Sequence, residues 1–150
     1  MAFRNIIREG DPILRKVSRP VENFDERLWT LLDDMAETLY RAEGAGLAAP
    51  QVGILRRVVV IDIGEGLIEL VNPVIIKKSG RQQEVEGCLS CPGQSGVTRR
   101  PMRVTVEAQN RHGETFTLSG EGLLARAFCH EIDQLDGILF KDHAIRMLEG

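Results

Sequence analysis

Residues 129–137, "CHEIDQLDG", carry side chains that suit metal-dependent hydrolysis. The segment begins as a His-Glu-x-x-His helix does, in which two imidazoles one turn apart hold a metal ion and the carboxylate accepts a proton from water. His130 and Glu131 fit this pattern, but Gln134 stands where the second histidine would be. Taken alone, the segment is weak evidence, because His-Glu pairs on helices are common and an exposed helix that carries one is the commoner case, so other parts of the chain must decide.

A second segment, "EGCLSCPG", places Cys88 and Cys91 at CxxC spacing. The chain has no second CxxC pair for a four-cysteine zinc site, and no thioredoxin-like pattern surrounds this one. Three cysteines without a secretion signal also argue against a disulfide framework. A single thiolate from Cys88, combined with His130 in a mixed metal site, is the most economical hypothesis. Simple burial of a small side chain is the alternative for each cysteine.

A third segment, "GAGLAAPQVG" at 44–53, combines glycines with a polar amide. Gly44 and Gly46 permit a close approach of the backbone to a ligand, and Gln51 offers an amide donor after the rigid Pro50. The segment lacks the GK[ST] ending of a phosphate-binding loop, and no strand precedes it. The alternative is a tight turn of small residues after a helix.

The elements that must position these residues follow from hydrophobic periodicity. A helix is predicted from apolar side chains at three- and four-residue spacing, with Asp25 as its cap and Gly44 as its stop. Those side chains are Leu28, Leu31, Leu32, Met35, Leu39 and Ala42. The segment before it, punctuated by Pro12 and Pro20, is expected to lie extended over the body of the protein.

Strands are predicted at 56–63 and 67–76, where β-branched residues are concentrated, and at 103–110, where apolar and polar residues alternate. The last of these should form a hairpin with "GETFTLSG". A second helix is expected from about Gly120 to Leu135, ended by Gly137. Strands followed by a late helix indicate an α+β fold, and no linker divides the chain, so residues 1–150 are expected to form one domain.

Composition excludes several function classes. The net charge of −3 argues against direct DNA binding through bulk charge. No apolar run reaches the length of a membrane span, and the first residues lack the apolar core of a signal peptide. We therefore expect a cytoplasmic location and no membrane partner.

The three segments, in this order, resemble those of the peptide deformylase family, and "DPILRKVSRPV" and "VNPVII" are also similar to its members. The resemblance covers nearly the whole chain. It implies an α+β enzyme in which antiparallel sheets pack around a central metal-site helix. The implied activity is removal of the N-terminal formyl group from formyl-methionyl nascent peptides. The ribosome is a further candidate partner.

The resemblance also implies roles for individual residues. Cys88 and His130 match metal ligands, and Gln134 occupies the position of the second histidine ligand. Glu131 matches the catalytic carboxylate, while Gln51 and the backbone N–H of Leu89 match the groups that polarise the formyl carbonyl. The metal implied is Fe²⁺, replaceable by Zn²⁺, Ni²⁺ or Co²⁺.

Substrate contacts are expected from one glycine and from one helix face. Gly46 belongs to the segment in which glycines permit close approach to a ligand. Leu123 and Ala127 share the helix face of His130 and Gln134, because the spacing is four, three and four, and we expect them to contribute to an apolar pocket for the methionine side chain.

Gln134 is the departure from the family pattern. A neutral amide is a poor substitute for imidazole towards Fe²⁺ or Zn²⁺, so weaker metal binding and lower activity are expected. Cys129 lies about 100° around the helix from His130 and is an unlikely replacement ligand; Cys91 and His143 are not placed by the sequence. Three hypotheses remain: a working deformylase, an inactive protein that binds formyl-methionyl peptides or the ribosome, and a structural zinc protein using Cys88, Cys91 and His130.

Overall fold

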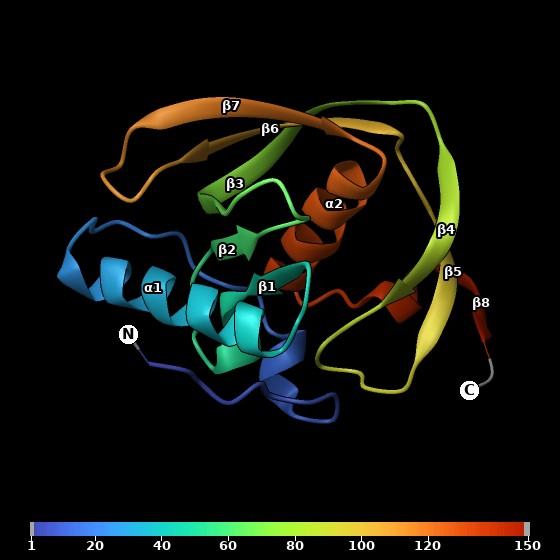
Figure 1. The fold of residues 1–150 in the computed structure, drawn as a ribbon, viewed down its shortest axis with the longest axis horizontal. Coiled ribbons are helices and arrows are strands. Elements are labelled where there is room, and N and C mark those ends of the chain that lie inside the picture. The colour runs from blue at the N-terminus through green and yellow to red at the C-terminus, as the bar shows by residue number, and fades with distance from the viewer. Residues whose placement is uncertain (1, 149–150) are drawn as a thin grey trace.

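The computed structural model describes residues 2–148, which form two antiparallel sheets and two α-helices (Figure 1). The five-stranded sheet has the order β1-β2-β3-β6-β7, and the three-stranded sheet has the order β4-β5-β8. Helix α2 lies between the two sheets, and α1 packs beside β1 and β2 (Figure 1). The α+β class and the central helix with sheets around it are therefore confirmed.

The bounds of the elements are as follows. The helices are α1 (Glu26–Arg41) and α2 (Leu123–Leu135); the short 3-10 helices are η1 (Pro12–Arg15), η2 (Ala49–Val52) and η3 (Phe140–Asp142); the strands are β1 (Gly46–Ala48), β2 (Val58–Ile61), β3 (Ile68–Ser79), β4 (Gln82–Gly87), β5 (Ser95–Arg100), β6 (Arg103–Gln109), β7 (Thr115–Glu121) and β8 (Ala144–Leu148).

Helix α1 forms where its apolar periodicity predicts. The Asp25 side chain accepts a hydrogen bond from the backbone N–H of Leu28 at 3.3 Å, which caps the first turn. Leu32, Met35 and Leu39 are fully buried and pack against β1 and β2. The helix ends at Arg41, before Gly44. A Cβ at Gly44 would lie 2.7 Å from the Leu89 side chain. Glycine at this position therefore allows Leu89 to pack closely against the backbone.

Helix α2 begins later than the periodicity predicts. Gly120 and Glu121 belong to β7, where they pair with Val104 and Arg103. Gly122 then adopts φ +60° and ψ −123°, a conformation that L side chains rarely adopt and that ends the strand. The helix therefore begins at Leu123, and the predicted start near Gly120 is wrong because β-pairing continues through Glu121.

The individual strands of the second sheet were not predicted from the sequence, and only the family resemblance implied more than one antiparallel sheet. The residues of strand β4 are mostly polar, and Val85 is its single apolar side chain, so the alternation of apolar and polar residues that predicts a strand is missing. β8 lies in the segment after α2 and pairs with β5. The segment 44–53, with its alternatives of ligand loop or tight turn, forms β1 and η2, and β1 pairs with β2 at the edge of the larger sheet.

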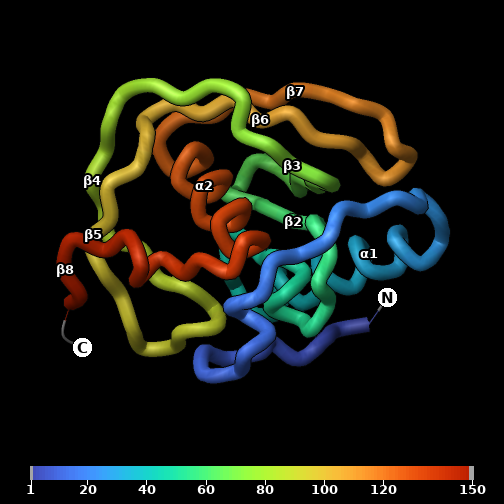
Figure 2. Tube along the Cα trace, turned by 180° about the vertical axis from the view of Figure 1, so that it is seen from behind, coloured from blue at the N-terminus to red at the C-terminus, as the bar shows by residue number. Residues whose placement is uncertain are grey.

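The N-terminal segment is mostly extended, as predicted, and it crosses the back of the molecule (Figure 2). The backbone N–H of Ser18 donates to the Leu135 carbonyl at 2.7 Å, which ties this segment to the end of α2. Residues 2–148 contain no helix that is both long and apolar enough to cross a membrane.

Asp34 on α1 anchors the first residues of the chain, and its removal should destabilise the protein in a pH-dependent way. The carboxylate is buried, accepts a hydrogen bond from the backbone N–H of Ala2 at 2.8 Å, and pairs with Arg4 at 2.8 Å. Burial raises its pKa, but the Ala2 N–H and the Arg4 guanidinium outweigh burial and leave the pKa below its ordinary value. A lowered folded-state pKa stabilises the fold above the unfolded value near 3.9, and this contribution disappears as pH falls through the folded value.

We therefore expect Asp34→Asn to lower the free energy of unfolding by about 1–3 kcal/mol at pH 7. The difference from the parent should shrink when urea unfolding is repeated at pH 3. Glu37→Gln removes an exposed ion pair with Arg41 on the same helix and should cost only about 0.3–0.5 kcal/mol. A pH-independent loss for Asp34→Asn would contradict this assignment.

Candidate active site

A cavity of about 460 Å³ lies where β1, η2, β4 and α2 meet. Every residue predicted for the site lines it except Gln134. The predicted residues that line it are Gly46, Gln51, Cys88, Leu89, Leu123, Ala127, His130 and Glu131. Three segments far apart in the sequence thus supply one site, which is the arrangement that their joint appearance suggested.

Gln134 lies against the Cys88 side chain, although it does not line the cavity. Its Nε2 donates a hydrogen bond to Cys88 Sγ at 3.0 Å. Its Oε1 is buried and has no hydrogen-bond partner within residues 2–148. Because an amide exposes either its N–H₂ or its oxygen after half a turn, rotation of the Gln134 amide would present a lone pair towards Cys88.

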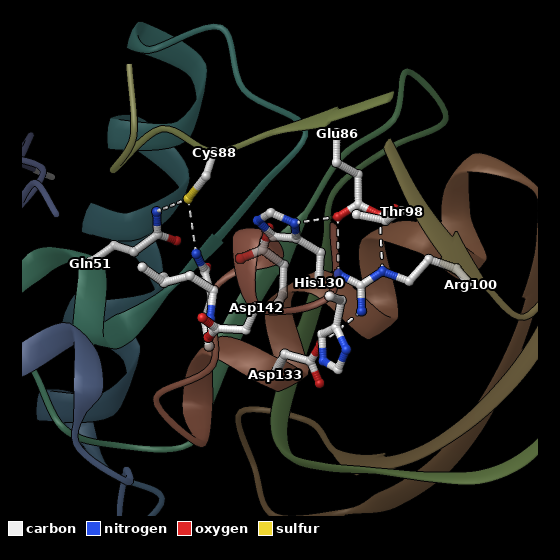
Figure 3. Close-up of polar contacts among 12 residues, drawn as sticks. Gln51, Glu86, Cys88, Thr98, Arg100, His130, Asp133 and Asp142 are labelled. Atoms are coloured by element: carbon white, nitrogen blue, oxygen red, sulfur yellow. Dashed lines mark hydrogen bonds and ion pairs between the residues drawn. The ribbon is translucent and has the colours of Figure 1, made fainter. Parts of the chain in front are cut away.

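His130 is held by a chain of charged groups behind it (Figure 3). Its Nδ1 lies 2.9 Å from Glu86 Oε1, and Arg100 donates to both Glu86 oxygens at 2.9 and 3.0 Å. Thr98 donates to the same carboxylate, and Arg100 also pairs with Asp133 at 2.7 Å. A carboxylate on Nδ1 fixes the tautomer and orients the ring, and it leaves Nε2 free to act as a ligand.

Burial and these contacts shift the pKa values of Glu86 and His130. Burial raises the pKa of Glu86, but His130 and Arg100 outweigh burial and hold it far below its ordinary value. Burial favours the neutral form of His130, whereas Glu131, Cys88 and Glu86 together raise its pKa to about 10. The site therefore concentrates negative charge around the ring of His130, which favours a cation at this point.

Glu86, Arg100 and Asp133 were not identified from the sequence. Glu86 stands two residues before Cys88, and that proximity is the only signal for it in the sequence. Charged residues are normally exposed, so the sequence gives no reason to bury Glu86 and Arg100 until their pairing across β4 and β5 is known.

Gln51 is fixed by hydrogen bonds at both ends of its amide. Its Oε1 accepts from the backbone N–H of Ala48 at 2.9 Å, so its Nε2 must point the other way. Nε2 donates to Ser90 Oγ at 3.0 Å and lies 3.7 Å from Cys88 Sγ. The turn that holds Leu89 is closed by a hydrogen bond from Cys91 N–H to the Cys88 carbonyl at 2.9 Å, which places Leu89 on the cavity wall.

Glu131 is almost fully buried beside Gly46. Burial raises its pKa to about 7, a value suited to proton transfer near neutral pH. Its Oε1 has no hydrogen-bond partner within residues 2–148. A Cβ at Gly46 would lie 2.6 Å from Glu131 Oε2, so the carboxylate occupies space that exists only because residue 46 is glycine.

The remaining cysteines and His143 take no place among the predicted ligands. Cys129 packs in the hydrophobic core, which agrees with the prediction that it points away from His130 and is not a replacement ligand. Cys91 packs with Leu139 and Phe140, and its burial raises its pKa to about 12. His143 pairs with Asp133 at 3.3 Å. In the part of the chain that the structure describes, no three His, Cys, Asp or Glu side chains form a group able to hold a metal, so the structural zinc site of Cys88, Cys91 and His130 is not formed.

The residues present fit a divalent cation with two strong donors and one weak donor. The Cys88 thiolate and the His130 imidazole are ligands that iron and zinc accept. The amide of Gln134 lies next to Cys88, and its unpartnered Oε1 is a neutral oxygen that would offer the third position once the amide has rotated. The donor set therefore fits the metal, and Gln134 is its weakest ligand.

Comparison with known proteins adds independent findings. The family model described as "Polypeptide deformylase" matches residues 3–149. The chain is 62% identical over 149 residues to the peptide deformylase of Acetivibrio thermocellus, covering 99% of this chain and 88% of that one. Its fold is similar to the crystal structure of peptide deformylase from Thermotoga maritima, with a TM-score of 0.95, 41% identity and coverage of 97% of this chain and 100% of that one. A peptide deformylase from Legionella pneumophila gives a TM-score of 0.92 with 48% identity, covering 95% and 86%.

Proposed function

This chain belongs to the peptide deformylase family, metal-dependent amidohydrolases that remove the N-terminal formyl group from nascent peptides, and from this premise we propose the roles of its own residues. Cys88, His130 and Gln134 hold the metal, Glu131 transfers the proton, and Gln51 with the backbone N–H of Leu89 holds the formyl oxygen. The observation that carries this proposal is the convergence of Cys88, His130, Glu131 and Gln51 on one cavity.

The divalent ion, when bound, lowers the pKa of water from about 15.7 to roughly 7 and polarises the formyl carbonyl. Cys88 and His130 supply its strong ligands, and Glu86 keeps the His130 ring oriented through the 2.9 Å contact at Nδ1. Gln134 supplies its amide oxygen after rotation, at lower affinity than an imidazole.

Glu131 accepts the proton of the attacking water and delivers it to the departing amine. Its raised pKa lets one carboxyl group perform both transfers near neutral pH. Burial beside Gly46 keeps bulk water away from the carboxylate.

Gln51 and Leu89 stabilise negative charge on the formyl oxygen. The Gln51 N–H₂ is already oriented by the bond that its Oε1 accepts from Ala48, so little reorganisation accompanies the reaction. Gly46, Leu123 and Ala127 contact the substrate, and the apolar side chains of Leu123 and Ala127 surround the methionine side chain.

Fe²⁺ is the metal that we propose for this chain, with Zn²⁺, Ni²⁺ or Co²⁺ as substitutes. Formyl-methionyl peptides are the substrates implied by family membership. We propose that the enzyme works in the cytoplasm and meets its substrates near the ribosome, where formylated chain ends emerge.

The test is formate release from formyl-Met-Ala-Ser-amide by protein loaded anaerobically with Fe²⁺, with metal content measured on the same sample. We expect turnover that a chelator abolishes and added Fe²⁺ restores. Saturable peptide binding without any formate would support the inactive binding protein instead. Formate release that persists after complete removal of metal would overturn the proposed ligand roles.

A further inference from the structure

Arg126 lines the active-site cavity, and none of the roles above uses it. It lies on α2, one turn before His130. Cα–Cβ bonds on a helix tilt towards its N-terminus, so the Arg126 side chain extends towards the Leu123 end of the cavity. His130 and Glu131 lie one turn deeper along the same helix.

The Arg126 guanidinium has no partner within residues 2–148. Its Nε is buried and makes no hydrogen bond, and the side chain forms no ion pair there. Other partly buried arginines contrast with it: Arg57 pairs with Asp136, and Arg111 pairs with Glu69. A buried N–H group is normally satisfied, so an orphaned one in a cavity wall marks the place of an external acceptor.

The acceptor must be a group of the substrate beyond formyl-methionine. The formyl end lies at Glu131 and Gln51 under the proposed function, on which this inference rests. A peptide advances about 3.3 Å per extended residue, and one helical turn spans about 5.4 Å, so one or two residues bridge the two positions. The reacting formyl amide is neutral and leaves the Arg126 charge uncompensated.

A carboxylate is the acceptor that best matches this group. Guanidinium is cationic throughout the physiological pH range, and its planar fork matches the two oxygens of a carboxylate. The neighbouring walls of the cavity include the buried Ala127 and the half-exposed Val85 and Leu123, which are all apolar and offer no competing acceptor to Arg126. We infer that Arg126 determines specificity by binding a carboxylate in the first or second residue after formyl-methionine, and so favours acidic nascent chains.

The experiment compares kcat/KM for peptides that differ only in one carboxylate. The pairs are formyl-Met-Asp-Ala-amide against formyl-Met-Asn-Ala-amide, and formyl-Met-Ala-Asp-amide against formyl-Met-Ala-Asn-amide. In the parent enzyme we expect the aspartate peptide of at least one pair to be favoured by about tenfold, and the preference to weaken at high salt. Formyl-Met-Ala as free acid and as amide shows whether a terminal carboxylate is accepted in the same way.

Arg126→Gln should bring the Asp/Asn ratio to about one, and Arg126→Lys should keep part of the preference because it retains a point charge without the fork. The matched control is Arg27→Gln, which removes the same charge from α1, away from this cavity, and should keep the parental ratio. A merely structural role for Arg126 would lower all four peptides equally and leave the ratio intact.

Two results would overturn the inference: no Asp/Asn preference in the parent, or an unchanged preference in Arg126→Gln. Binding of the deformylated peptides Met-Asp-Ala-amide and Met-Asn-Ala-amide, measured by calorimetry, repeats the comparison without hydrolysis. Loss of turnover with a retained, Arg126-dependent binding preference would contradict the proposed function and leave the Arg126 assignment standing.

Discussion

Glu131→Ala should lower formate release by about 10²–10⁴-fold while the metal content of the protein stays at the parental level. The carboxylate is almost fully buried in the cavity wall, and burial raises its pKa to about 7. Its Oε1 has no hydrogen-bond partner in residues 2–148, so it is available to a proton that arrives from water. Because Cys88 and His130 supply the strong ligands, removing Glu131 should not release the ion.

The measurement pairs a formate assay with metal analysis on identically loaded samples. Glu131→Gln is the matched variant, since it keeps the volume beneath Gly46 and the fold around it while it removes the base. We expect both variants to lose the same factor in kcat. Persistent turnover in either one would remove Glu131 from the mechanism, and a parallel loss of metal would mean that it acts as a ligand.

The sequence predicted well what depends on local pattern. Helix α1 follows from leucine spacing and the Asp25 cap, and the β6–β7 hairpin follows from alternation on either side of a polar turn. The segments around Gln51, Cys88 and His130 were assigned to one site because they resemble the segments of one family. Their placement around one cavity agrees with that grouping.

What the sequence did not predict depends on contacts between distant residues. Glu86 and Arg100 are both buried, and either charge would be unfavourable there without the other. Strand β4 has no apolar alternation because its inward position carries Glu86, whose partners come from β5 and α2. The start of α2 was placed too early because a glycine conformation, and not hydrophobic spacing, ends β7.

Gln134→His is expected to raise metal affinity and formyl-peptide hydrolysis together. Loss of a residue that only supports a metal ligand typically costs about 10–100-fold in affinity or activity, so gain of a ligand should have at least this effect. Gln134 is nearly fully buried, and its amide already lies 3.0 Å from the Cys88 sulfur, so an imidazole at this position would reach the same point. Imidazole is a much better ligand for Fe²⁺ or Zn²⁺ than a neutral amide oxygen. It would also replace the buried Oε1, which has no partner within the described residues.

Metal titration of the parent and Gln134→His, followed by formate release at defined metal occupancy, separates affinity from turnover. Gln134→Leu is the control, because leucine has a similar volume and offers no atom that could bind the metal. If Gln134 supplies an oxygen ligand, the order of affinity should be His above Gln above Leu. Equal affinity for the Gln and Leu proteins would show that Gln134 does not contact the metal, and equal affinity for all three would exclude position 134 from the site.

The Leu variant also tests a second effect of Gln134, whose side-chain N–H donates a hydrogen bond to Cys88. If that N–H competes with the metal for the thiolate, the Leu protein should bind metal more tightly than the Gln protein.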